Sequence, residues 1–234
     1  DTSLLNGTVT DRKNLLLVKD NSGKLTFEGK DLNNGGIWTF TPEIENGLNV
    51  KDNAGNVIGS KEEWYLTHID RSVNNDTQVL LDGSDSSYAM WRNTNDTLRK
   101  HLGDLHYRTN KKGVEGIWAH YTGGKFAGSG FDSSYNMYQL GYDKADNAKS
   151  TYGFALESGT GHADYSLGSG KDKLFSGSFY GTWTGDDGSY TDVVAKIGQF
   201  DTDIKSYGDY PDKASYKNRA YSVSIEYGKT IELS

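Results

Sequence analysis

The sequence contains no cysteine and only two prolines in 234 residues. The absence of cysteine excludes disulfides, and with the scarcity of proline it fits a chain that crosses an oxidising compartment unfolded. No stretch approaches the ~18 consecutive apolar residues of a membrane-spanning helix, but the ~9–11 alternating residues of a barrel strand are not excluded. Residues 1–7 carry neither the basic nor the apolar region of a signal peptide, so we expect a chain that is processed or cut from a longer one.

The composition also lacks the basic surface that nucleic-acid binding requires. The formal net charge is -7, and no basic stripe runs through the whole chain. Hydrophobic residues make up only 34% of the chain, whereas glycine reaches 29 residues and tyrosine 16. Nucleic acid is therefore not an expected partner, and the apolar surface is either laid out thinly or belongs to a fold that is not compact.

Three regions differ in their patterns: residues 1–82, 83–112 and 113–234. In the first, short apolar runs such as 14–18 and 36–40 are separated by Asn-Gly and related turn sequences. This pattern predicts short strands joined by turns.

The second region holds the one predicted helix, from Ser86 or Ser87 to about His106. Five side chains fall on one face at helical spacing, and the serines can supply an N-cap. These five are Tyr88, Trp91, Leu98, Leu102 and Leu105. About nineteen residues give a rod close to the ~30 Å of a bilayer core. A helix inside a pore and an amphipathic helix lying on a sheet both remain open from this pattern.

From residue 116 onward, large apolar side chains alternate with small or polar ones, which predicts β-strands. We expect six strands, at about 116–125, 136–144, 150–162, 173–184, 190–201 and 216–233. Long and short connections alternate between them, as in outer-membrane barrels.

The two faces of these strands differ in character. The side chains expected to face lipid are Leu140, Phe154, Phe179, Val193, Ile197, Val223 and Ile225. Those expected to face a hydrated lumen are Asp143, Glu157, Asp192, Lys196 and Glu226. A soluble β-sandwich also alternates, but aromatics near the strand ends are typical of an interfacial girdle. The face of glycine, serine and acids also could not pack against a second sheet.

The charge of the helix supports a place inside such a lumen. Residues 92–112 carry six basic residues against two acidic ones, and the inward list is mainly acidic. We therefore hypothesise that a cationic helix is held in an anionic pore, where a low dielectric strengthens the attraction. The predicted pore-helix residues are Trp91, Arg92, Leu98, Arg99, Lys100, Leu102 and Leu105.

Several short motifs resemble classical autotransporters, the type V secretion proteins. TLRKHLGDLH at 97–106, GIWAHYTGG at 116–124 and YQLGYD at 138–143 resemble the pore helix and the first two barrel strands. YGTWT at 180–184 with GSYTD at 188–192 resembles the next part of that domain. GIWTF at 36–40 with WYL at 64–66 is similar to the end of a pertactin-type passenger, where a β-helix closes.

The resemblance implies a mostly β chain in three parts. Residues 1–82 would be an autochaperone-like, β-helical passenger end capped by Trp38, Phe40, Trp64 and Tyr65, with surface ligand binding as the alternative role of these aromatics. Residues 83–112 would be the linker and pore helix, and 113–234 about six antiparallel strands of an incomplete transmembrane barrel. The implied function is an outer-membrane translocator and surface anchor of a secreted passenger. The implied partners are outer-membrane lipid, the barrel-insertion machinery, periplasmic chaperones and its own passenger.

The sequence departs from the family pattern in two places. The family's barrel has twelve strands and ends in Phe or Trp, whereas six strands and Ser234 stand here, so we expect a truncated chain. Relatives that cleave themselves inside the pore use two adjacent asparagines in this helix. The matching positions in this sequence are Asp96 and Thr97, and Asn95 precedes them. Passenger cleavage stays open, with an uncleaved passenger favoured.

Catalytic and metal-binding patterns are lacking. His162 and Asp164 near Ser158 have the residue types of a triad, but polar strand ends collect such residues routinely. No pair of histidines has metal-ligand spacing. We therefore expect no enzyme, metal or cofactor. The alternative function is a soluble, aromatic-rich surface-binding module with a β-sandwich fold.

Overall fold

The computed structural model describes residues 14–33, 35–106 and 113–229. The chain divides into two compact units, Asp1–Thr77 and Gln78–Ser234. Each unit is described by itself below.

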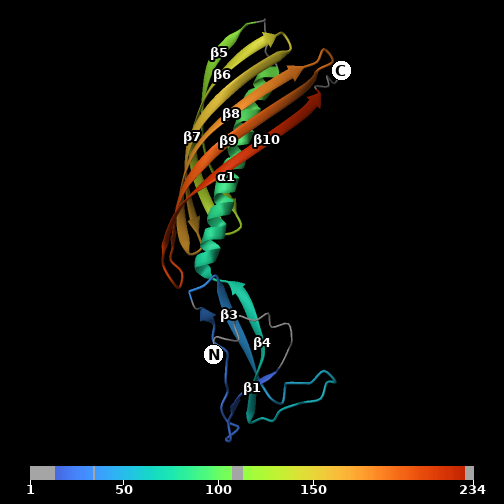
Figure 1. Ribbon diagram of the computed structural model, residues 1–234, viewed down its shortest axis with the longest axis vertical. Coiled ribbons are helices and arrows are strands. Elements are labelled where there is room, and N and C mark those ends of the chain that lie inside the picture. Colours follow the sequence, from blue (N-terminus) through green and yellow to red (C-terminus); the bar gives the residue numbers. More distant parts are fainter. Residues whose placement is uncertain (1–13, 34, 107–112, 230–234) are drawn as a thin grey trace. The chain divides into compact units, whose positions relative to one another are not determined.

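The first unit contains a four-stranded antiparallel sheet in the order β1-β4-β3-β2 (Figure 1). Its strands are β1 Leu15–Lys19, β2 Leu32–Asn33, β3 Trp38–Asn46 and β4 Glu63–Val73. Among the described apolar side chains of this unit only Val50 is buried, at 3% exposed. The sheet is therefore a single layer whose apolar side chains stay partly open.

A β-helix is not formed by the described residues of this unit, so that part of the prediction is wrong. A β-helix stacks parallel strands, whereas β3 and β4 pair antiparallel from Trp38↔Val73 to Asn46↔Trp64. Alternation with turn signals predicts strands, but it does not distinguish parallel from antiparallel pairing. The pairing depends on which strands meet in space.

The four aromatic residues predicted to cap the passenger lie on both faces of this sheet. Trp38, Phe40 and Trp64 share one face by register, and Tyr65 lies on the other. The Arg71 guanidinium lies 4.4 Å from the centroid of the Trp38 ring, and Phe27 meets Trp64 edge-on at 5.6 Å. These contacts are local packing.

The turn after β1 is built around Asp20. Its carboxylate accepts hydrogen bonds from the Ser22 hydroxyl at 2.7 Å and from the Lys24 and Leu25 N–H groups at 3.0 Å. Gly23 adopts the left-handed backbone conformation that this turn requires, with φ of 57°. The hydrogen bonds, that of Ser22 above all, stabilise the charged carboxylate and lower the pKa of Asp20 to about 2.

Helix α1 spans Asn75–His106, 32 residues, and begins eleven residues before the predicted Ser86. Its N-cap is Asn74, whose side-chain oxygen accepts the Thr77 N–H at 2.8 Å. The predicted cap at Ser86 and Ser87 is wrong because both serines are buried within the helix. The Ser87 hydroxyl donates to the Gly83 carbonyl at 3.0 Å, a bond made inside a helix rather than at its start.

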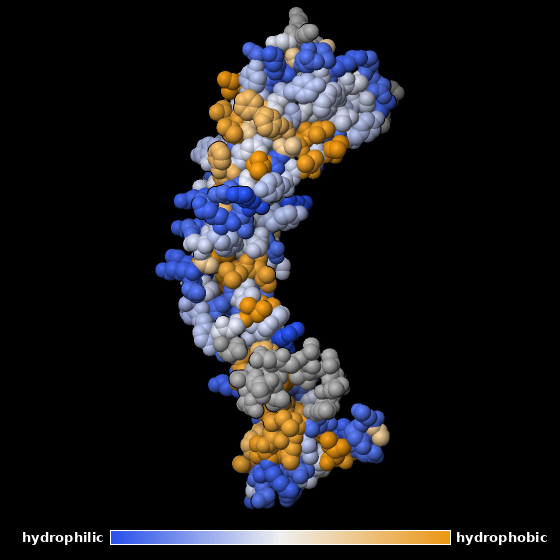
Figure 2. Space-filling model, viewed as in Figure 1, coloured by the Kyte–Doolittle hydropathy of each residue, from blue (hydrophilic) through white to orange (hydrophobic). Residues whose placement is uncertain are grey.

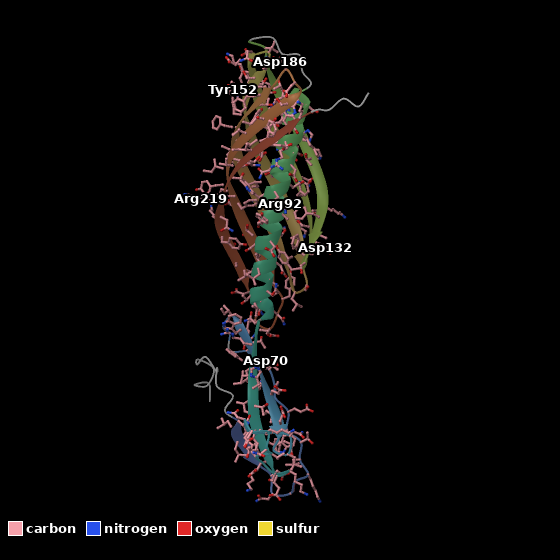
Figure 3. The ribbon with its side chains drawn as sticks, turned by 90° about the vertical axis from the view of Figure 1, so that its right-hand side faces the viewer. Asp70, Arg92, Asp132, Tyr152, Asp186 and Arg219 are labelled. Atoms are coloured by element: carbon pink, nitrogen blue, oxygen red, sulfur yellow. The ribbon has the colours of Figure 1, made fainter. Side chains whose placement is uncertain are left out.

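In the second unit, six strands form one antiparallel meander in the order β10-β9-β8-β7-β6-β5. They are β5 Glu115–Gly128, β6 Phe131–Asn147, β7 Ser150–Tyr165, β8 Gly168–Thr184, β9 Ser189–Ser206 and β10 Lys213–Lys229. The sheet is curved, and α1 lies along its concave side (Figures 1 and 3). The fold is mostly β with one helix, as predicted.

Strands β5 to β9 are longer than predicted, and the predicted alternation of long and short connections is wrong. Residues 126–135 and 163–172 mostly continue the strands, leaving two-residue turns at 129–130 and 166–167. The other connections are residues 148–149, 185–188 and 207–212. Polar and small side chains in these stretches resemble loop sequences, but they occupy both faces of strands that run on past the apolar part of the sheet.

Candidate functional site

The buried side of α1 and the concave face of the six-stranded sheet form the candidate site, called the helix–sheet interface below. Apolar side chains meet there in three clusters along the helix. The cluster near its start is Val79, Phe131, Ala163, Tyr165 and Ile204; the middle cluster is Met90, Trp91, Tyr135, Met137, Leu174 and Phe200; the cluster near its end is Leu98, Leu102, Leu105, Ala155, Tyr180 and Val194. Their burial holds α1 against the sheet along its length.

The predicted pore-helix residues divide between the two sides of α1. Trp91, Leu98, Leu102 and Leu105 lie in the interface and are at most 6% exposed. Arg92, Arg99 and Lys100 are exposed, and Figure 3 shows Arg92 on the side of α1 that the sheet leaves open. Tyr88, predicted on the apolar face, is 62% exposed. That prediction is wrong because the buried stripe runs through the smaller Ser86 and Ser87 instead.

Glycines on the sheet let α1 approach closely. A Cβ at Gly198 of β9 would lie 2.6 Å from Cζ3 of Trp91, and one at Gly159 of β7 would lie 2.8 Å from Cε of Met90. The helix has a corresponding glycine, Gly83, where a Cβ would lie 2.4 Å from Cδ1 of Ile204 on the sheet. Larger residues at these positions would force the helix away from the sheet.

A buried ion pair lies under the middle of α1. The Lys196 ammonium contacts the Glu157 carboxylate, and both side chains are 0% exposed. Glu157 also accepts hydrogen bonds from Gln139 and Ser176, each at 2.5 Å. Lys196 donates to the Thr94 hydroxyl of α1. The pair predicted to face the lumen is therefore fully enclosed and joined to the helix.

Lys196 also lies over an aromatic ring. Its Nζ is 4.7 Å from the centroid of the Trp91 ring, a cation–π contact. Because a buried charge without partners costs several kcal/mol, the carboxylate, the hydroxyl and the ring together make this position tolerable for an ammonium. Removing any one of them would raise the cost of holding the ammonium there.

Two histidines fasten the last turns of α1 to inward-facing aspartates. Nε2 of His101 lies 3.1 Å from both oxygens of Asp143, and Nε2 of His106 lies 2.8 and 3.1 Å from those of Asp192. His101 stacks on Trp118 at 4.1 Å between ring centroids. These two contacts join α1 to β6 and β9.

A third polar contact joins the first half of α1 to the sheet. The Ser87 hydroxyl shares its one hydrogen between the Gly83 carbonyl and Asp172, which it reaches at 2.9 Å, and the Thr202 hydroxyl donates to the same carboxylate oxygen at 2.6 Å. Sequence reasoning did not single out Thr94, His101 or His106 as contacts of the sheet, and it assigned Ser87 to a helix cap instead. Their partners lie far away in sequence, so no local pattern could have identified them.

The predicted attraction between a cationic helix and an anionic lumen takes a different form. Among the lysines and arginines of α1, Arg99 reaches an acid of the sheet, with its Nε 3.8 Å from Glu226, and that pair is about half exposed. The buried acids Asp143 and Asp192 meet histidines instead. A count of lysine and arginine treats histidine as neutral and so missed these contacts.

The convex face of the sheet carries the residues predicted to face lipid. Leu140, Phe154, Phe179, Ile197, Val223 and Ile225 are 45% to 74% exposed. Val193 lies on the same face by register and is half-buried between its neighbours. Figure 2 shows hydrophobic side chains gathered as a band across the upper part of the view, with hydrophilic side chains above and below it.

Aromatic side chains border this band at both ends. Tyr121 and Tyr138 pair at 5.0 Å between ring centroids on one side, and Tyr152 and Trp183 pair at 5.6 Å on the other. From Phe175 to Trp183 the band covers about 27 Å of strand, or about 21 Å of height at a tilt of ~40°, near the ~25 Å of a barrel's apolar belt.

A family model described as the autotransporter beta-domain matches residues 114–234. The chain belongs to this autotransporter family. The matched residues hold all six strands of the curved sheet, from β5 to β10. This part of the chain is therefore autotransporter beta-domain sequence, and it lies in the bacterial outer membrane.

Two solved structures are similar to the autotransporter chain described here. The beta domain of the Bordetella autotransporter BrkA has 24% sequence identity and a TM-score of 0.47, with 51% of each chain covered. The translocator domain of NalP from Neisseria meningitidis has 15% identity and a TM-score of 0.53, with 62% of this chain and 53% of that chain covered. This chain thus spans about half the length of both structures, and the likeness to NalP concerns the fold.

A comparison with curated protein sequences found no match. Among the described residues of this autotransporter, no helix is long and apolar enough to cross a membrane. Within the same residues, no group of three or more histidines and acids is arranged to hold a metal ion.

Proposed function

We propose that residues 78–229 form part of the wall and the pore helix of a translocator that exports and anchors its own passenger, and that residues 14–77 belong to the exported part. The observation that carries this proposal is the contrast between the two faces of the curved sheet. Buried polar contacts hold α1 on the concave face, and an apolar band covers the convex face. A polar lumen with an apolar exterior is the arrangement that a membrane barrel requires.

The proposed role is secretion and surface anchoring without chemistry on a substrate. The residues with triad types support this view by their position. His162 and Asp164 lie 3.7 Å apart with side chains 49% and 76% exposed, on the outward face of β7. A catalytic site needs a pocket that orients its groups and excludes water, whereas these two side chains lie open to solvent.

Four partners fit this role: outer-membrane lipid, the barrel-insertion machinery, periplasmic chaperones and the passenger itself. The edges of the sheet support the need for helpers. In the described part of the chain β5 and β10 each pair on one side only, and hydrocarbon cannot satisfy unpaired backbone groups. These edges need shielding before insertion and pairing within the membrane.

The single-layer sheet of the first unit fits an autochaperone role. Trp38, Phe40 and Trp64 share one partly open face, on which preceding passenger residues could pack as they emerge. The proposal keeps the passenger uncleaved, because Asp96 and Thr97 stand where self-cutting relatives have paired asparagines. A soluble β-sandwich is not favoured, since no second sheet covers the convex face within the described residues.

An epitope-insertion experiment tests the orientation that this function requires. The protein is expressed from its own gene in a Gram-negative host, with an epitope placed in the exposed turn 52–55 or, separately, in the turn 185–188. We expect protease added to intact cells to remove the first epitope and to reach the second only after lysis. Protection of the first epitope on intact cells, or cleavage of the second, would contradict the proposal.

A further inference from the structure

The two ends of the curved sheet differ in how their charged side chains are used. We call the end of the sheet beside the first residues of α1 the helix-start end, because Val79 of α1 packs there against Phe131 and Ile204. Turns 129–130 and 166–167 and the connection 207–212 lie at this end. The helix-finish end holds turns 148–149 and 185–188. In the proposed orientation the helix-start end lies toward the cell surface, since the exported residues precede α1.

At the helix-finish end the lysines are paired with acids of the chain itself. Lys149 lies 2.6 Å from Asp186, and Lys229 lies 2.8 Å from Asp187. Lys144 lies 3.9 Å from Glu115. These cations therefore have counter-ions without any other molecule.

At the helix-start end the outward cations are mostly unpaired. Lys171, Lys173 and Arg219 are exposed and have no ion-pair partner among the described residues. Lys217 lies 3.7 Å from Asp201 with 70% of its side chain exposed. Figure 3 shows Arg219 projecting from the outer side of β10.

These four cations lie on β8 and β10, the two strands that flank β9. Lys173 and Lys217 are the register partners of Asp201 on β9 from its two sides, and Arg219 stands opposite Gln199. Lys171 stands opposite Asp203, whose carboxylate is occupied by the Ser215 hydroxyl at 2.6 Å. With Asp201 engaged by Lys217 and Gln199, the patch keeps an excess of positive charge.

The depth of the patch matches that of lipid head groups. Arg219 lies in the same register row as Phe175, with Gln199 between them, and Phe175 is the last apolar residue of the band on β8. Lys173 lies two residues farther along, about 7 Å of strand or about 5 Å of height at a tilt of ~40°. Long basic side chains at such a boundary extend their charges into the interface.

We propose that Lys171, Lys173, Lys217 and Arg219 bind the phosphate groups of an anionic lipid in the outer leaflet of the membrane. The band beside them receives the acyl chains, and the guanidinium of Arg219 is suited to bidentate contact with a phosphate. The pairing at the opposite end confines this recognition to one leaflet. The inference rests on the proposed membrane function, which it refines with a lipid class.

Native mass spectrometry in detergent tests this site, using the protein purified from membranes and titrated with diphosphoryl lipid A. The comparison lipid is lipid A from which both phosphates have been removed. Each Lys or Arg beside an anionic lipid surface strengthens binding by about fivefold, so the double variant Lys173→Gln, Arg219→Gln should bind diphosphoryl lipid A about twenty-fivefold more weakly. Asp201→Asn should bind it more tightly, a gain that misfolding cannot produce.

The matched control is Lys149→Gln, Lys229→Gln, which removes two cations from the helix-finish end and should leave the affinity unchanged. Equal affinity of the natural protein for both lipids, or equal weakening in both double variants, would overturn the proposed site. Full displacement by inorganic phosphate would also overturn it, because a free anion does not lie on the apolar band. A protein that binds neither lipid contradicts the membrane function as well.

Discussion

Replacement of Lys196 by methionine tests the buried ion pair under α1. Methionine keeps most of the side-chain volume but leaves the Glu157 carboxylate enclosed without its ammonium, at a site where both side chains are 0% exposed. Breaking one partner of a buried pair costs about 3–5 kcal/mol. Because Gln139 and Ser176 still donate to Glu157, we expect a loss near the lower end, about 3 kcal/mol of unfolding free energy.

The assay is urea unfolding in detergent of protein purified from the outer membrane, together with hydrogen exchange of the α1 amides. The double variant Lys196→Met, Glu157→Gln removes both charges and should recover stability to within about 1 kcal/mol of the natural protein. In the single variant Lys196→Met, hydrogen exchange should become faster first at the amides around Thr94, whose hydroxyl loses its contact with Lys196. A cost below about 1 kcal/mol for Lys196→Met, or a double variant that is worse than the single one, would refute the reasoning.

Three further predictions concern packing, conductance and pH. Gly198→Ala should lower the free energy of unfolding by about 1–3 kcal/mol, because the new Cβ would lie 2.6 Å from Trp91. In the same unfolding assay the control Gly177→Ala should be nearly neutral, because its Cβ would lie 3.6 Å from its nearest neighbour. Equal effects of the two substitutions would contradict the close approach of α1 to the sheet. Arg99→Glu with Lys100→Glu should raise single-channel conductance in planar bilayers, since a carboxylate at position 99 would repel Glu226, and unchanged conductance would show that these charges do not hold the helix. The pKa of Asp20 is lowered to about 2, so its charged carboxylate stabilises the turn above the ordinary carboxyl pKa, and this stabilisation is lost as pH falls through about 2. An NMR titration of the Asp20 carboxyl carbon measures this pKa. A value near 3.9 would disprove the hydrogen bonds of the turn.

The six-stranded sheet could be predicted from the sequence because a strand with one face in lipid shows its period directly. Tyr221, Val223, Ile225 and Tyr227 alternate with small or polar residues, and these four are 65% to 74% exposed on the convex face. The ends of the strands could not be predicted in the same way. Beyond the band both faces are polar, so the period that marks a strand fades while the backbone pairing continues.

The start of α1 could not be predicted because the buried side of its first half has no apolar periodicity in the sequence and is set by contacts with the sheet. Gly83, Ser86 and Ser87 are buried where the sheet approaches closely, and small polar residues give no apolar stripe. The same residues are frequent at helix N-caps. The actual cap, Asn74, lies directly after β4 and was included in the turn-rich first region.

The polar contacts of the helix–sheet interface lay beyond sequence reasoning. The inward positions of Asp143, Glu157, Asp192 and Lys196 follow from alternation, but their partners on α1 do not. His106 and Asp192 are 86 positions apart, and Thr94 and Lys196 are 102 apart. Such pairs become visible only when the curvature and register of the sheet are known.

Site-directed spin labelling tests the central claim, that the convex face lies in lipid while the concave face holds α1. The chain contains no cysteine, so single cysteines at Phe179 and Ser178, neighbours on β8 that are 74% and 2% exposed, can be labelled without background. In outer membranes we predict that oxygen dissolved in lipid relaxes the label at position 179, and that neither oxygen nor a water-soluble nickel chelate reaches the label at 178. Equal access of oxygen to both positions, or ready access of the nickel chelate to position 179, would contradict the account.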